Sequence, residues 1–229
     1  MEFSIVKNTM YISFIIQIVT LVIGVSAQFI KLKPHQLILK QALFLENFVQ
    51  LIEGTFYFWF IYFYKKNVDK IDIAKYRYYD WFLTTPTMIL STIAFFYYNN
   101  NNLTKKHIDI ISFFKNDFFK IIELFFYNFN MLIFGFLQEI NVIKIIISTF
   151  FGFVFFALLF YKMFIYYVNN NLYNIIIFYS MFIIWALYGI AAIFNSRLKN
   201  TSYNILDTFS KNFYGLFLSF IVYKLSISN

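Results

Sequence analysis

Long apolar runs alternate with short polar links along the whole chain. About 20 mostly apolar residues are enough to cross the hydrocarbon core of a bilayer as a helix, and seven runs meet that length. They cover residues 9–30, 38–64, 76–98, 111–137, 141–168, 172–194 and 201–224. The links are too short to hold a second unit with its own core. The pattern predicts an all-α membrane protein, a bundle of seven transmembrane helices that forms a single domain over residues 1–229.

The composition agrees with the lipid bilayer as the surroundings of this bundle. Of 229 residues, 61% are hydrophobic and 13% are charged, whereas soluble domains carry about 25% charged residues. The net charge of +8 would suit a nucleic-acid binder, but lysines such as Lys31 and Lys33 fall in expected links, where they anchor helix ends at the membrane surface. We therefore expect no nucleic-acid partner. The chain has no cysteine, so it has no thiolate metal site, and we expect no metal.

Within residues 205–222 of the last apolar run, the only ionisable side chains are Asp207, Lys211 and the phenol of Tyr214. A charged group in hydrocarbon is costly, so such residues face the protein interior and mark functional sites. A buried lysine amine can condense with an aldehyde to form a Schiff base, and the resulting cation needs a carboxylate nearby. Asp207 lies four residues before Lys211 on the same helical face and suits that role.

The third run carries a second acid within a row of polar positions. On a helix, Asp80, Thr84, Met88 and Ser91 recur at i, i+4, i+8 and i+11 and therefore share one face. We expect this face to point into the bundle. Pro86 interrupts the run, but membrane helices tolerate proline where nearby hydroxyl groups compensate for the lost hydrogen bond.

The second run carries a similar polar stripe, formed by Glu46, Gln50, Glu53 and Tyr57 at i, i+4, i+7 and i+11. Two uses of this stripe stay open. It can serve as a proton route, or its carboxylates can line a pathway for cations, which rows of acidic groups select.

Two motifs in the chain resemble those of the microbial (type 1) rhodopsins. The first is R-Y-x-D-W-x-x-T-T-P at residues 77–86, and the second is D-x-x-x-K-x-x-x-G at residues 207–215. Residues 185–189, W-A-L-Y-G, are similar to the family's W-x-x-Y-P, with glycine in place of the usual proline. The chain is rich in Phe, Ile, Asn, Lys and Tyr, which are amino acids with AT-rich codons. This composition and the stretch 203–212 are similar to those of rhodopsins carried by giant viruses of aquatic protists.

The resemblance implies a cofactor and a set of charged residues around it. All-trans retinal would be bound as a Schiff base on Lys211. Asp80 would be its counterion and primary proton acceptor, and Asp207 the second counterion. Arg77 would lie one turn outward of Asp80, and Thr84 would orient the Asp80 carboxylate.

The resemblance also implies which side chains contact the retinal. Trp81 and Trp185 would enclose the polyene, Tyr188 would hydrogen-bond toward Asp207, and Met88 suggests green absorption. The full set of expected contact residues is Tyr57, Trp81, Thr85, Met88, Asn128, Met131, Gly135, Trp185, Tyr188, Ser210 and Lys211.

Three light-dependent functions are compatible with these residues, none of them enzymatic. The D-T-S triplet at Asp80, Thr84 and Ser91 favours a light-driven outward proton pump. Ser91 stands where such pumps usually hold a carboxylic proton donor, and a serine hydroxyl does not release its proton at neutral pH. We predict that Glu46 replaces the donor, against the alternatives that it is a structural acid or that water reloads the site directly. A light-gated cation channel and a sensory photoreceptor are the other candidates.

The remaining expectations concern the outer side and the membrane. Glu139 is expected to be a solvated acid in the link after the fourth run, and the link at 195–200 has no carboxylate pair of the kind that releases protons early. By the same resemblance the N-terminus is outside and the C-terminus cytoplasmic, in a host-cell membrane or endomembrane if the chain is viral. The family also implies a homo-oligomer.

Overall fold

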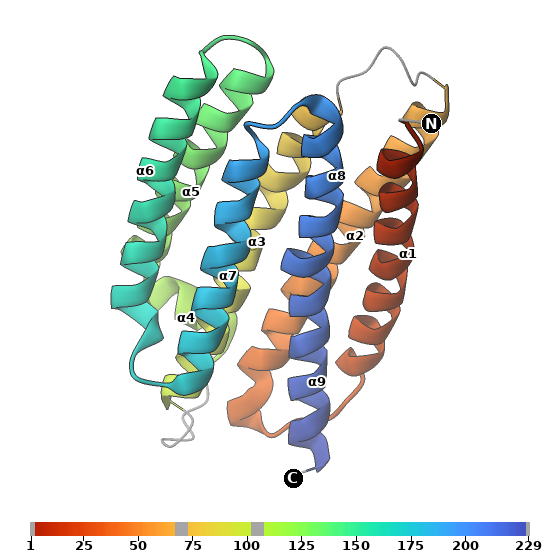
Figure 1. Cartoon of the computed structure of the whole chain (residues 1–229). Helices are drawn as coiled ribbons and strands as arrows, with labels where there is room; N and C mark the ends of the chain where they lie inside the picture. The colour runs from red at the N-terminus through yellow and green to blue at the C-terminus, as the bar shows by residue number, and fades with distance from the viewer. Residues whose placement is uncertain (1–2, 67–72, 102–107, 228–229) are drawn as a thin grey trace.

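The computed structural model describes residues 3–66, 73–101 and 108–227, and these form helices joined by short turns. The helices run alternately up and down side by side, and the N- and C-termini lie at opposite ends of the bundle (Figure 1). We call these ends the N-terminal end and the C-terminal end. The elements are α1 (Phe3–Gln28), η1 (Pro34–Gln36), α2 (Leu37–Lys66), α3 (Ala74–Asn101), α4 (Ile110–Asn116), α5 (Phe118–Glu139), α6 (Ile145–Met163), η3 (Phe164–Val168), α7 (Leu172–Ala191), α8 (Ser196–Asp207), η4 (Thr208–Asn212) and α9 (Phe213–Ile227).

The seven predicted spans correspond to these elements, so the predicted helical membrane bundle is confirmed. The fourth span is divided at Asp117 into the short helix α4 and the long helix α5. The last span is longer than predicted, because it begins at Ser196, where the Asn195 side chain accepts a hydrogen bond from the Leu198 amide at 3.0 Å. The residues predicted as a link at 195–200 are therefore mostly helical.

Polar and apolar helices have different places in the bundle. Among the described residues, four helical segments are long and apolar enough to span a membrane by composition alone: Ile5–Gln28, Phe118–Glu139, Ile145–Val168 and Leu172–Ala191. Many of their exposed side chains are large and hydrophobic, as expected of a lipid-facing surface, for example Phe119 at 87% exposure and Ile146 at 78%. One set of charged side chains from α2, α3 and the last span is instead buried between helices and forms an interior polar site: Glu46, Glu53, Arg77, Asp80, Asp207 and Lys211.

The helix that carries Lys211 changes its winding at that residue. The turn η4 has π-helical hydrogen bonding, and it connects α8 to α9. A π turn inserts one extra residue into a helix and is common at functional sites. Lys211 is 2% exposed at the middle of this last span, about halfway between the two ends of the bundle.

Candidate functional site

Three carboxyl groups surround the Lys211 amine. Its Nζ lies 2.7 Å from Asp80 Oδ2, 3.3 Å from Glu53 Oε1 and 3.6 Å from Asp207 Oδ1. All four side chains are buried. The acids come from α3, α2 and α8, so three separate helices converge on one cation. Asp80 is the closest of the three and also hydrogen-bonds the amine.

The contact between Glu53 and Lys211 was not predicted from the sequence. The polar stripe on the second run included Glu53, but only as a step in a proton route or a cation pathway. A signal was present in the spacing: Glu53 lies four residues before Tyr57, which was expected beside the retinal. One helical turn therefore separates Glu53 from a residue of the predicted site.

Asp207 is held by donors on both of its oxygens. Arg77 Nη1 lies 2.9 Å from Oδ2, and the Tyr57 hydroxyl donates to the same oxygen at 2.8 Å. The Tyr188 hydroxyl donates to Oδ1 at 2.7 Å and lies 2.8 Å from Ser210 Oγ. Hydrogen bonds to an ionised carboxylate are short and strong, so this arrangement fixes the Asp207 side chain.

The charges of the site are close to balance. Arg77 and Lys211 are cations, and Glu53, Asp80 and Asp207 are carboxyl groups, all in one buried cluster. Full ionisation would leave one negative charge without compensation, which is costly away from water. One proton held among the three carboxyls makes the cluster neutral. Moving any further proton then changes the energy of every other member, because the interior screens charges weakly.

A second polar group lies on the C-terminal side of Lys211. The Ser91 hydroxyl donates hydrogen bonds to Glu46 Oε1 and, at 2.9 Å, to the main-chain carbonyl of Met88. One turn from Glu46 on α2, Gln50 Nε2 donates to the main-chain carbonyl of Lys211 at 2.9 Å. Glu46, Gln50 and Ser91 are each at most 1% exposed. The structure therefore brings Glu46 and Ser91 into contact, and it connects their stripe to the lysine.

Thr84 is predicted to orient the Asp80 carboxylate, but the hydrogen bond of its hydroxyl goes to the main chain. Its hydroxyl donates to the main-chain carbonyl of Asp80 at 3.0 Å, one turn back along α3. Thr85 donates to the Trp81 carbonyl in the same way at 2.8 Å. These bonds use carbonyls of the turn before Pro86, which lacks an amide hydrogen.

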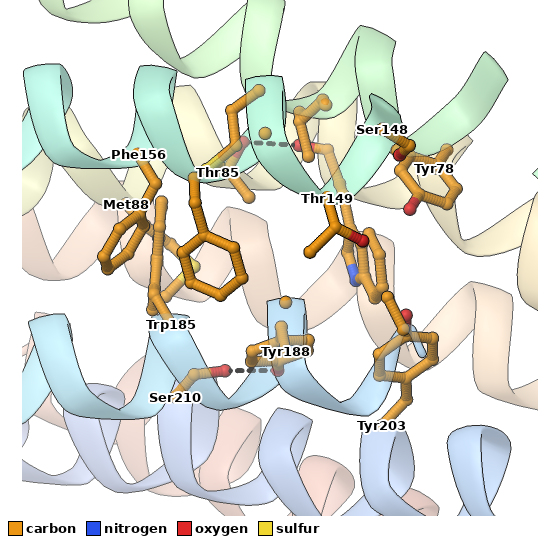
Figure 2. A pocket seen from close by; sticks show the side chains of 18 of the residues that line it. Tyr78, Thr85, Met88, Ser148, Thr149, Phe156, Trp185, Tyr188, Tyr203 and Ser210 are labelled. Atoms are coloured by element: carbon orange, nitrogen blue, oxygen red, sulfur yellow. Dashed lines mark hydrogen bonds between the residues drawn. The ribbon is translucent and has the colours of Figure 1, made fainter. Parts of the chain in front are cut away.

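A cavity extends from Lys211 to α5 and α6, with side chains of α3, α6, α7 and α8 around it (Figure 2). Its walls include most of the expected retinal-contact residues: Trp81, Thr85, Met88, Met131, Gly135, Trp185, Tyr188 and Ser210. Tyr57 and Asn128 do not line it, because Tyr57 reaches Asp207 and the Asn128 amide donates to the Thr85 hydroxyl at 2.9 Å.

Sequence reasoning missed the wall that α6 contributes. Ser148, Thr149 and Gly152 line the far end of the cavity, with two phenylalanines from the same helix. A Cβ built on Gly152 would meet no atom within 4 Å, so this glycine leaves open space. A side chain at Gly135 would instead collide with the Tyr78 hydroxyl. The available signal was the small-residue group Ser148, Thr149 and Gly152 within a run of Phe and Ile.

The residues present fit a retinal molecule. The cavity has apolar and aromatic walls, an amine at one end and carboxyl groups around that amine. These are the properties required to hold an apolar polyene aldehyde that becomes a cation when it condenses with the lysine. Small residues at the other end leave room for the bulky ring of the ligand.

The comparison with protein families agrees with this site. Residues 8–225 match the model of the bacteriorhodopsin-like proteins. The chain belongs to this family. Its members bind retinal and act as light-driven transporters or photoreceptors rather than as enzymes.

Solved structures of several rhodopsins have the same fold. The viral rhodopsin OLPVRII is 28% identical, with a TM-score of 0.83 over 96% of this chain and 98% of its own. A blue light-absorbing proteorhodopsin from Med12 is 18% identical, with a TM-score of 0.72 over 96% of each chain. Xanthorhodopsin, a light-driven ion pump with dual chromophore, is 16% identical, with a TM-score of 0.74 over 99% and 95%. Among curated proteins, no sequence matches the chain.

The interpretation of Glu139 as a solvated link residue is wrong. Glu139 is the last residue of α5 and is 6% exposed. Its two oxygens lie 2.7 and 2.8 Å from Nζ of Lys199, which is also 6% exposed and belongs to the second turn of α8. The longer helix α8 explains the difference, because it carries Lys199 inward instead of leaving it in a link.

This buried pair leads to a stability prediction. Glu139→Gln or Lys199→Met alone should lower the free energy of unfolding by about 3 to 5 kcal/mol, because each leaves one charge buried without its partner. The double variant Glu139→Leu/Lys199→Met should recover most of that loss. Thermal unfolding in detergent, followed by circular dichroism, tests this. Lys120→Ala, which removes an exposed ion pair with Asp117, is the control and should change little. Equal destabilisation in the single and double variants would contradict the prediction.

Proposed function

We propose that the chain is a light-driven outward proton pump that carries all-trans retinal on Lys211. Retinal, bound to the lysine as a Schiff base, supplies light absorption and an isomerisation that displaces the lysine nitrogen. The observation that supports the proposal best is the 2.7 Å contact between Lys211 Nζ and Asp80 Oδ2. A proton on this nitrogen can pass to Asp80 without an intermediate group.

The surrounding residues give that transfer a direction. Asp207 is fixed by Arg77, Tyr57 and Tyr188, so it keeps its position while Asp80 accepts the proton. Arg77 lies on the same helix one turn closer to the N-terminal end. In the proposed orientation this end faces outside, so a proton on Asp80 leaves through the Arg77 side. Trp81, Trp185 and Met88 hold the retinal in its cavity and keep water from the transfer site.

Light-induced current tests the proposal. Cells that express the protein and are supplied with retinal are held under voltage clamp and scanned from negative to positive potential. A pump gives an outward current that persists at zero driving force and does not reverse. A current that reverses with the cation gradient would reject pumping in favour of a channel.

Glu46 is the proposed proton donor. Glu46→Gln should slow reprotonation of the Lys211 nitrogen by about a hundredfold, because the amide has no proton to give. Azide should restore part of the rate by carrying protons to the site. Flash-induced absorption changes measure this recovery, and Glu123→Gln, a change at a half-buried acid of α5 that pairs with Lys162, is the matched control. Unchanged recovery in Glu46→Gln would exclude the donor role.

One feature favours the cation channel as a second candidate. Ser13, Gln17 and Thr20 form a buried polar face on α1 that meets α2 and the last span. Gln17 Nε2 donates to the main-chain carbonyl of Gln50 at 3.0 Å, and within the described chain Thr20 Oγ1 has no hydrogen-bond partner. Such a polar file beside Glu46 and Glu53 suits hydrated ions. A reversing current that Gln17→Leu abolishes would favour the channel.

The setting of the protein is part of the same proposal. We infer a single domain over residues 1–229, with the N-terminus outside and the C-terminus cytoplasmic. The membrane would be that of a host cell or an endomembrane if the chain is viral. We further infer a homo-oligomer.

A further inference from the structure

Tyr214 places a phenol hydroxyl next to the proposed proton donor. It lies at the start of α9, three residues after Lys211. Its oxygen is buried near Glu46 and close enough to Ser91 and Thr92 to interact with them, but no group of the described chain meets the geometry of a direct hydrogen bond to it. Residues of α2, α3 and α9 therefore meet one turn from Lys211, on its C-terminal side. The proposed proton path from Glu46 to the lysine crosses this region.

Packing alone does not account for this hydroxyl. The Tyr214 ring stacks on Phe217 with centroids 6.3 Å apart, and a phenylalanine would make the same contact. A buried hydroxyl without a partner costs free energy, whereas a phenylalanine at this position would not incur that cost. The phenol hydroxyl therefore indicates a role in hydrogen bonding or proton transfer rather than in packing.

Glu46 offers the matching group. One of its oxygens accepts from Ser91, and the other, Oε2, is buried with no hydrogen-bond partner in the described chain. No ion pair within the described residues involves Glu46, and an isolated buried carboxyl holds its proton rather than ionise. A protonated acid and a phenol, each with a free hydrogen-bonding atom, are suited to a link through one water molecule.

We propose that Tyr214 is the relay between Glu46 and the Lys211 nitrogen. Glu46 gives its proton to the bridging water, the water gives one to the phenol oxygen, and the phenol releases its own proton toward the nitrogen. At the end Glu46 is a carboxylate, Tyr214 is again neutral, and the nitrogen has gained one proton. This inference rests on the proposed function, because it requires Glu46 to be the donor.

The test compares Tyr214→Phe, Glu46→Gln and the double variant. Tyr214→Phe should slow reprotonation about tenfold, which corresponds to the loss of one hydrogen bond in the transfer. It should add no slowing to Glu46→Gln, because both residues act in one path. A second readout needs neither light nor retinal: the infrared carbonyl band that Glu46→Gln removes should shift in Tyr214→Phe, with retinal present or absent. Tyr223→Phe, an exposed position on the same helix, is the control.

The outcomes separate the relay from the donor. If Glu46→Gln slows recovery and Tyr214→Phe does not, the relay is wrong and the donor stands. If Glu46→Gln has no effect, the donor role of Glu46 is wrong, and the relay role of Tyr214, which depends on it, is wrong as well. Additive slowing in the double variant also overturns the relay. If Tyr214→Phe does not bind retinal, difluorotyrosine at position 214 keeps the shape and alters the proton affinity, and an unchanged rate would then overturn the relay.

Discussion

Lys211→Met should remove the visible absorption of the protein completely. Among the described residues that line the cavity, Lys211 alone carries an amine, so in the variant retinal would have no group there with which to condense. The variant also leaves Glu53, Asp80 and Asp207 with one cation fewer, so they must take up protons to remain buried. Absorption spectra of the purified protein after addition of retinal measure the effect, and light-induced current should disappear as well.

The control must separate loss of the amine from loss of the fold. Lys224→Met changes an exposed lysine near the end of α9 and should leave the spectrum unchanged. Circular dichroism should show that Lys211→Met keeps its helices. A visible band in Lys211→Met that survives denaturation in acid would mean that another residue carries the cofactor.

The helices and the polar face of α3 could be predicted because they depend on local periodicity. Apolar length gives the spans, and i, i+4 spacing gives the buried face of Asp80, Thr84 and Ser91. Charges inside an apolar run single out Asp207 and Lys211, and the family motifs then give them roles. Each of these inferences needs only residues within one helix or a motif of fixed spacing.

The contacts that could not be predicted depend on how far each helix is shifted along its axis relative to its neighbours. Glu53 reaches Lys211 because α2 and the last span are aligned so that Tyr57 meets Asp207. Glu139 finds a partner sixty positions away because α8 begins a turn earlier than its hydrophobicity indicates. Helix starts depend on capping side chains, and the position of one helix along its axis relative to its neighbour depends on packing between the two. Neither can be predicted from the hydrophobicity of a single segment.

Asp80→Asn should abolish outward transport while the protein still binds retinal. Asparagine keeps the shape of aspartate but takes up no proton, so deprotonation of the Lys211 nitrogen should slow by at least about a hundredfold. Flash-induced absorption changes and current under voltage clamp give the two measurements.

Glu53→Gln is the informative comparison. Glu53 Oε1 lies 3.3 Å from Lys211 Nζ, and Asp80 Oδ2 lies 2.7 Å from the same atom. If distance and the direct hydrogen bond decide which carboxyl accepts, Glu53→Gln keeps rapid deprotonation. If Glu53→Gln stops it and Asp80→Asn does not, Glu53 is the acceptor. The proton would then move toward α2, along the stripe that leads to Glu46. Transport would lose its outward direction, because one row of residues would serve both to accept and to resupply the proton.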